Sequence, residues 1–109
     1  MITFDTANST GLLAAFKKAI DDKKVVTWSY DKDGDFTHTP QQWSGKAWLR
    51  PVVSQGRLTM NFLGPKGVTW EVFGVYHGRF IESMIVHCND LFTTGTATSK
   101  PATSDSIAA

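Results

Sequence analysis

The fold is decided by the stretch from Ala47 to Leu63, which reads AWLRPVVSQGRLTMNFL. Apolar and polar residues alternate from Leu58 to Phe62, the period of a strand with one face in the core. The joint Ser54–Gly56 is so short that the strands on either side of it must run antiparallel. The stretch therefore predicts two paired strands, Ala47–Val53 and Arg57–Leu63.

A proline within the first strand and a turn after the second strand indicate how this pair lies in the sheet. Pro51 has no backbone N–H to donate, so the first strand is expected at an edge of the sheet or with a bulge there. The turn-forming Gly64-Pro65-Lys66-Gly67 then leads into a run rich in β-branched and aromatic residues, which predicts a third strand over Val68–Val75. Together the three strands form an antiparallel meander.

Upstream, Val25–Tyr30 is expected to be another strand, and its end overlaps the stretch Ser29–Phe36, which reads SYDKDGDF. Its alternating aspartates resemble a calcium loop, but glycine and glutamate are missing from the loop positions where calcium coordination needs them. Asp33-Gly34 is instead expected at the centre of a two-residue hairpin turn. The segment Thr37–Lys46 has no apolar period and is expected to be a surface loop.

Two amphipathic helices complete the pattern. Apolar residues at helical spacing predict one over residues 9–23, capped by Asn8, Ser9 or Thr10, and a second within Tyr76–Phe92. The economical arrangement is a two-layer α+β domain, an antiparallel meander of about four to five strands with both helices on one face. A small barrel with helices capping its ends is the alternative.

The chain is expected to form one domain over residues 1–92, with residues 93–109, rich in small polar residues, as a flexible tail. A net charge of +1 gives no general attraction to nucleic acid or acidic membranes. The single cysteine, with no apolar run long enough to span a bilayer, favours a cytoplasmic protein that does not enter membranes.

One candidate ligand site is the joint of His77, Gly78 and Arg79, expected at the start of the last helix. Helix N-termini attract anions, and a guanidinium adds a forked contact to a carboxylate or phosphate. The alternative is structural, with Gly78 easing a turn, Arg79 pairing with Glu82, and His77 partly buried. A small-molecule or anion-binding enzyme centred on His77 and Arg79 is therefore the second functional hypothesis.

Other chemistry is poorly supported by the spacing of residues. Neighbouring His87 and Cys88 diverge around a helix, so neither a zinc site nor a thiol–imidazole pair is expected. Cys88 falls on the apolar stripe, and His77 is badly spaced to act with Glu82 as an acid–base pair. We therefore predict no catalytic residues, no metal and no cofactor. The sequence favours a protein that is not an enzyme and leaves the enzyme hypothesis at His77 and Arg79 as the alternative.

A candidate partner-binding surface consists of Trp43, Trp48 and Arg50. Tryptophan and arginine dominate the energetics of protein interfaces, and an antiparallel sheet with helices on one side leaves its other face free. The alternative is that the tryptophans of the loop anchor it over the end of the sheet. The leading hypothesis is thus a module that binds a protein partner or itself.

Nucleic acid is the least favoured partner. Between Thr39 and Arg79 there are five basic residues and one acid, interleaved with Trp43, Trp48 and Trp70. Aromatic residues beside cations suit a single strand, but these cations are scattered rather than clustered.

The Thr37–Trp48 loop with its following strand, and the run Val75-Tyr76-His77-Gly78-Arg79-Phe80-Ile81-Glu82, resemble stretches of small bacterial proteins to which no activity is assigned. The similarity spans most of residues 10–92. It implies a bacterial, cytoplasmic protein and identifies no site residues.

Overall fold

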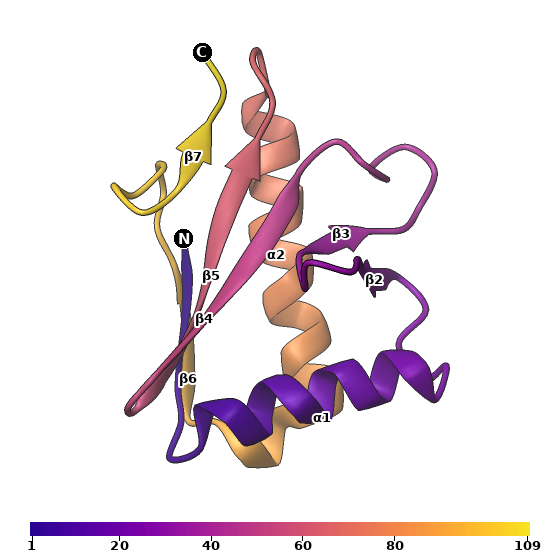
Figure 1. Ribbon diagram of the computed structural model, residues 1–109, viewed down its shortest axis with the longest axis vertical. Coiled ribbons are helices and arrows are strands. Elements are labelled where there is room, and N and C mark those ends of the chain that lie inside the picture. Colours follow the sequence, from indigo (N-terminus) through magenta and orange to yellow (C-terminus); the bar gives the residue numbers. More distant parts are fainter.

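The computed structural model describes residues 1–109 as an α+β fold. Figure 1 shows α2 running along β4 and β5, with α1 crossing near the C-terminal end of α2. In chain order the elements are β1 (Ile2–Asp5), α1 (Ser9–Asp21), β2 (Trp28–Tyr30), β3 (Phe36–His38), β4 (Trp48–Ser54), β5 (Arg57–Gly64), α2 (Trp70–Cys88), a 3₁₀ turn (Asn89–Leu91), β6 (Thr94–Ala97) and β7 (Ser106–Ile107).

The sheet has the strand order β2-β3-β4-β5-β1-β6, and β7 pairs with the end of β5. All pairs are antiparallel except the short β5–β7 pair. The prediction of an α+β domain with an antiparallel sheet is confirmed, but the sheet is seven-stranded and so larger than predicted. Without the β2–β3 hairpin, the order of elements and strands is that of the ferredoxin-like split βαβ arrangement.

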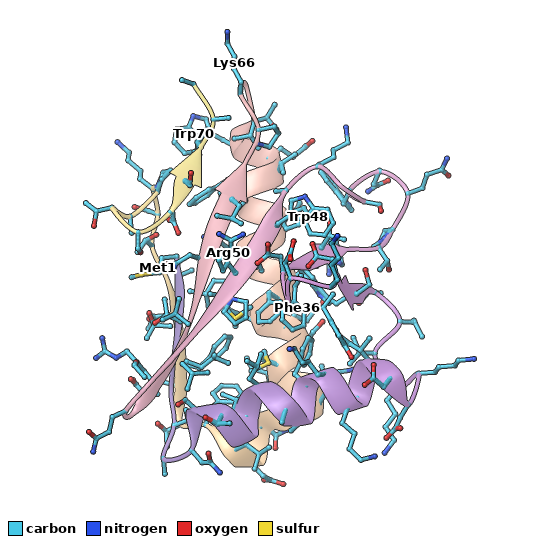
Figure 2. The ribbon with its side chains drawn as sticks, in the orientation of Figure 1. Met1, Phe36, Trp48, Arg50, Lys66 and Trp70 are labelled. Atoms are coloured by element: carbon cyan, nitrogen blue, oxygen red, sulfur yellow. The ribbon has the colours of Figure 1, made fainter.

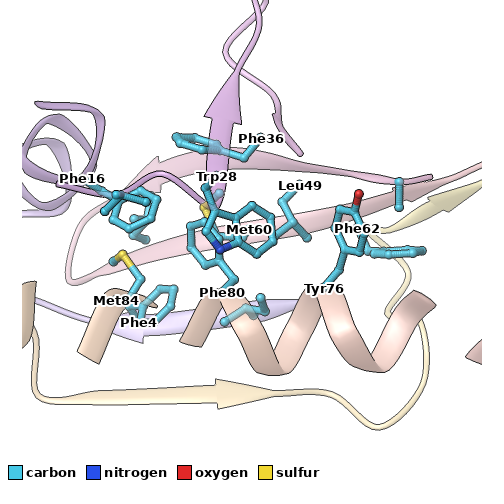
Figure 3. Close-up of a cluster of buried hydrophobic side chains, with 14 of the residues drawn as sticks. Phe4, Phe16, Trp28, Phe36, Leu49, Met60, Phe62, Tyr76, Phe80 and Met84 are labelled. Carbon is cyan, nitrogen blue, oxygen red and sulfur yellow. The ribbon is translucent and has the colours of Figure 1, made fainter. Parts of the chain in front are cut away.

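One hydrophobic core lies between the sheet and the two helices (Figure 3). Trp28 of β2 packs edge-on against Tyr76 and Phe80 of α2, with ring centroids 5.6 and 5.0 Å apart. The β2–β3 hairpin therefore packs against α2. The largest fully buried side chains are Trp28, Tyr76, Phe4, Phe16, Phe36, Phe62, Phe80, Ile2, Leu12, Leu49, Leu58 and Met60.

The predicted first helix and the predicted strand pair are confirmed. Asn8 caps α1, because its side-chain oxygen accepts a hydrogen bond from the Gly11 N–H at 2.9 Å. Beyond Leu49, β4 has no partner on its β3 side, so Pro51 lies on an edge, as its missing donor requires.

The hairpin around Gly34 is present, but its loop differs from the predicted two-residue turn. It extends from Asp31 to Asp35, and Gly34 has a left-handed φ of 84°. The Asp31 carboxylate accepts the backbone N–H groups of Asp33 and Asp35, at 2.9 and 3.0 Å. Asp31 therefore organises the loop.

The predicted strand over Val68–Val75 is wrong, because α2 begins at Trp70. The Thr69 hydroxyl accepts a hydrogen bond from the Val72 N–H at 3.2 Å, and Glu71 lies favourably in the first turn. The buried residues Val72, Phe73, Tyr76 and Phe80 follow a helical period. Burial of this face outweighs the strand preference of the β-branched residues.

Both ends of the chain add strands that were not predicted. β1 lies between β5 and β6, and β6 and β7 lie in the segment 93–109, for which a flexible tail was expected. Gly95 of β6 sits against the ring of Phe4, where an added Cβ would come within 3.0 Å of it. Packing and pairing with β1, rather than the strand propensity of its own residues, thus determine the structure of β6. No helix in the fold has both the length and the apolar character needed to cross a bilayer.

Candidate functional site

One face of the sheet is turned away from the hydrophobic core, and we call it the open face. Both helices pack into the core on the opposite side, through residues such as Phe16 of α1 and Phe80 of α2. The open face includes outward positions of four strands, among them Trp48, Arg50 and Val52 of β4, Thr59, Asn61 and Leu63 of β5, Thr3 of β1, and Thr96 of β6.

Strand register arranges much of the open face in rows. Val52 lies opposite Thr59, Thr59 opposite Thr3, and Thr3 opposite Thr96. Each of these side chains is branched at Cβ and restricted in χ1. The row is therefore a stiff surface that loses little side-chain entropy when another surface covers it.

Arg50 is held in place on β4 by an acid from the hairpin. Its Nε donates to Oδ1 of Asp35 at 2.9 Å and its second guanidinium nitrogen donates to Oδ2 at 2.8 Å. The Asp35 side chain is 8% exposed and that of Arg50 is 55% exposed. Hydrogen bonding to Asp35, together with its charge, raises the pKa of Arg50 above its usual value. The result is a fixed, solvent-facing guanidinium.

Trp48 and Val52 flank Arg50 on the same face of β4 (Figure 2 labels Trp48 and Arg50). Trp48 is half-buried and lies opposite Leu63 in the register, and Val52 is 46% exposed. Period-two spacing thus brings together two of the three residues predicted to bind a partner. The surface they form combines a large aromatic ring, an oriented cation and an aliphatic side chain.

Trp43, the third residue of that predicted surface, lies elsewhere. It packs against the core, and its carbonyl accepts a hydrogen bond from the Tyr76 hydroxyl. The Thr37 hydroxyl fixes the same loop by donating to the Ala47 carbonyl at 3.0 Å and accepting from the Gly45 N–H at 3.1 Å. Trp43 therefore belongs with the structural alternative, as an anchor of its loop.

The predicted ligand site of His77, Gly78 and Arg79 is not at the start of a helix, because these residues lie in the middle of α2. His77 is buried, while Gly78 and Arg79 are exposed. Arg79 donates to both carboxylate oxygens of Glu82, at 3.1 and 3.2 Å. The imidazole and the guanidinium thus face different surroundings, and the free N–H groups that motivated an anion site belong to residues near Trp70.

Both ring nitrogens of His77 have partners. Nδ1 donates to the Phe73 carbonyl at 2.7 Å, which leaves Nε2 to accept from the Met1 ammonium at 2.9 Å. Burial lowers the pKa of His77 and also that of His38, whose Nδ1 lies 2.7 Å from the Thr27 carbonyl. Both imidazoles are therefore held mainly neutral at pH 7, as structural groups.

The basic residues that motivated the nucleic-acid hypothesis are partly neutralised and dispersed. Arg50 is paired with Asp35 and Arg79 with Glu82. Lys46 lines two shallow hollows beside the start of α2, of about 200 and 470 Å³, and Lys66 lines the smaller one. Lys46 and Lys66 thus lie beside the start of α2, whereas Arg50 and Arg57 lie at outward register positions of the sheet.

The remaining candidates are the Cys88 thiol and the side chains of metal-binding type. Cys88 is buried, and burial raises the pKa of its thiol, which keeps it protonated. No three side chains of the metal-binding types are grouped to hold an ion.

The roles of three residues were missed or misassigned from the sequence. Asp35 could have been found from the alternating aspartates after β2, which place an acid next to a strand. Trp70 was assigned to a strand, but at the start of α2 it is 67% exposed. Asp105, which is buried in a tight polar cluster, stands among small polar residues and had no local signal.

Comparison of the chain with protein-family models, with curated proteins and with solved structures finds no match.

Proposed function

We propose that this protein is a non-enzymatic interaction module that binds a protein surface, its own or another protein's, through the open face around Trp48, Arg50 and Val52. The observation that carries the proposal is the group on β4. An aromatic and an aliphatic side chain flank a guanidinium that a nearly buried carboxylate holds in one orientation.

Several features of the group suit a protein partner. Tryptophan and arginine are the residue types that most often dominate binding energy. Because Asp35 already orients Arg50, binding costs less side-chain entropy than for a free arginine. Arg50 and Asp35 neutralise each other, so the surface repels neither acidic nor basic partners and is compatible with a second copy of itself.

The proposal predicts that Trp48→Ala weakens association at least about tenfold, because it removes the largest apolar side chain of the surface. Sedimentation equilibrium over a range of protein concentrations measures self-association. A photo-crosslinking amino acid at position 52, incorporated in cells, captures a different protein bound to the same face. The matched control is the crosslinker at Val86, an exposed aliphatic residue on α2.

Adducts or dimers that depend on position 52 and on Trp48 support the proposal. A monomer at all concentrations with no adduct specific to position 52 overturns it. Equal crosslinking from positions 52 and 86 also counts against it, because the open face would then have no preference over α2. Circular dichroism of Trp48→Ala confirms that any lost association is not lost folding.

A further inference from the structure

The edge of β5 beyond the end of β1 forms a second surface. β1 pairs with β5 only from Arg57 to Met60, which leaves the end of β5 without a β1 neighbour. β7 occupies this position in parallel, with Leu63 opposite Ser106 and Gly64 opposite Ile107. The Ala108 N–H extends the pairing by donating to the Gly64 carbonyl at 2.9 Å. The C-terminal residues are therefore seated on a strand edge as an added strand.

Asp105 anchors this segment. Its side chain is fully buried, and Oδ1 accepts the Phe62 N–H of β5 at 2.7 Å. Oδ2 accepts the Ala102 N–H and the Met1 ammonium, both at 2.8 Å. A backbone donor of β5 is thus paired with a side chain rather than with a strand, which makes the edge selective for a carboxylate at this position.

Ile107 supplies an apolar contact next to the anchor. It lines a small hollow of about 140 Å³ together with Val68, Trp70 and Phe73. Figure 2 shows Trp70 at the end of the molecule where β7 lies. If β7 left, the exposed indole of Trp70 and the ring of Phe73 would lose this aliphatic neighbour.

The connection between β6 and Asp105 makes few contacts with the sheet. All seven residues from Thr98 to Ser104 are exposed or half-buried. Besides the bond to Asp105, this segment contacts β5 through the Ser104 hydroxyl, which donates to Oδ1 of Asn61 at 2.8 Å. Thr98 itself is tied to Met1, whose carbonyl accepts the Thr98 N–H at 3.0 Å and whose ammonium donates to the Thr98 hydroxyl at 3.1 Å. The segment from residue 99 to 109 is therefore an arm, whose attachment to β5 is concentrated at residues 104–107.

We propose that the edge of β5 from Phe62 to Gly64 is a strand-addition site, occupied within one chain by residues 105–107, that takes the same residues of a second copy by exchange of arms. The arm of another molecule would reproduce each hydrogen bond of the arm present here, because the two are identical. A short tether gives the arm of the same chain an effective concentration of the order of millimolar. In a dimer with reciprocal exchange, each chain gives one arm and receives one. The second arm is then also bound within the same complex, so it has the same advantage of high effective concentration. The inference does not depend on the open face.

Exchange can be tested with two full-length variants, Leu63→Cys and Ser106→Cys, because these residues are opposite each other across the β5–β7 pair. The variants are mixed at high protein concentration in a glutathione buffer, and covalent dimers are separated without reducing agent. A disulfide between the two different variants requires the arm of one chain to lie on β5 of the other. Wild-type protein, with only the buried Cys88, gives the background.

Exchange predicts that mixed dimers exceed the two kinds of same-variant dimer by at least about fivefold and rise with protein concentration. Adding Asp105→Ala to the Ser106→Cys chain should abolish this excess. The double variant Leu63→Cys with Ser106→Cys, when dilute, should form an intrachain disulfide, which shows that the substituted edge still pairs. If that disulfide forms but mixed dimers never exceed same-variant dimers, arm exchange is wrong. Trp48→Ala in both chains should leave the mixed dimers unchanged, which separates this result from the open-face proposal.

Discussion

At His77, burial rather than a charged partner decides the protonation state. The imidazole stacks on Phe73 with ring centroids 3.9 Å apart, and the Met1 ammonium further disfavours a second positive charge. The hydrogen bond to the Phe73 carbonyl and, to a smaller extent, the charge of Asp105 oppose this lowering of the pKa only in part. The pKa of His77 in the folded protein is therefore below its value in the unfolded chain.

This shift makes stability depend on pH. Above the unfolded pKa of about 6.5, His77 is neutral in both the folded and the unfolded state, and it does not lower the free energy of unfolding. As the pH falls below that value, the unfolded chain binds a proton that the folded protein rejects, so stability is lost until the folded pKa is reached. Each unit of pKa depression corresponds to about 1.4 kcal/mol.

We predict that His77→Gln reduces the loss of unfolding free energy between about pH 7.5 and pH 5. Glutamine keeps a polar side chain but does not titrate in this range. Urea unfolding at each pH measures the effect. His38→Gln is a parallel test of the same effect, because burial is also the main cause that lowers the pKa of His38, so both variants should have flatter profiles than wild type. A His77→Gln profile parallel to that of wild type would show that His77 does not contribute.

At the scale of elements, α2 contains two exposed glycines that carry a stability cost. Gly74 and Gly78 lie in the helix interior, and a Cβ added to either would meet no atom within 4 Å. We predict that Gly74→Ala and Gly78→Ala each raise the free energy of unfolding by about 0.5–1 kcal/mol. Gly64→Ala should do the opposite, because its Cβ would come within 2.8 Å of Phe62 and 2.9 Å of Val68. Urea titrations check all three, and destabilisation by both helix substitutions would show that α2 needs these glycines.

The same elements show what could be predicted from the sequence. α1 and β5 have a clear period, and α1, β4 and β5 have local caps or turns. The predicted strand Ala47–Val53 contained Trp48 and Arg50, which the register places on one face. The predicted start of α2 was too late in the sequence. Val68, Thr69 and Val72 favour strands locally, while the buried face of the helix is stabilised only by tertiary packing. β6 has no apolar pattern at all. Its position depends on pairing with β1, which is far away in the sequence.

In the whole molecule, Asp105 joins the two ends of the chain to the central strand. Its carboxylate receives the Met1 ammonium at the start of β1, the Phe62 N–H of β5 and the Ala102 N–H of the arm. These groups are far apart in sequence and close in space, a contact that no local pattern reveals. Because the carboxylate is fully buried, its charge is screened little by solvent and its loss is expensive.

We predict that Asp105→Asn lowers the free energy of unfolding by about 2 kcal/mol or more, since it leaves the ammonium without a counter-charge and cannot satisfy all three donors. Thr98→Val is the matched control. It removes only the hydroxyl that accepts from the same ammonium at 3.1 Å and should cost less than about 1 kcal/mol. Hydrogen exchange should show Phe62 and Ala102 losing protection in Asp105→Asn beyond the global change, while α1 follows global unfolding. Equal costs for the two variants, or unchanged protection at Phe62, would mean that the polar cluster does not join the chain ends energetically. The arm would then be held chiefly by its backbone pairing with β5.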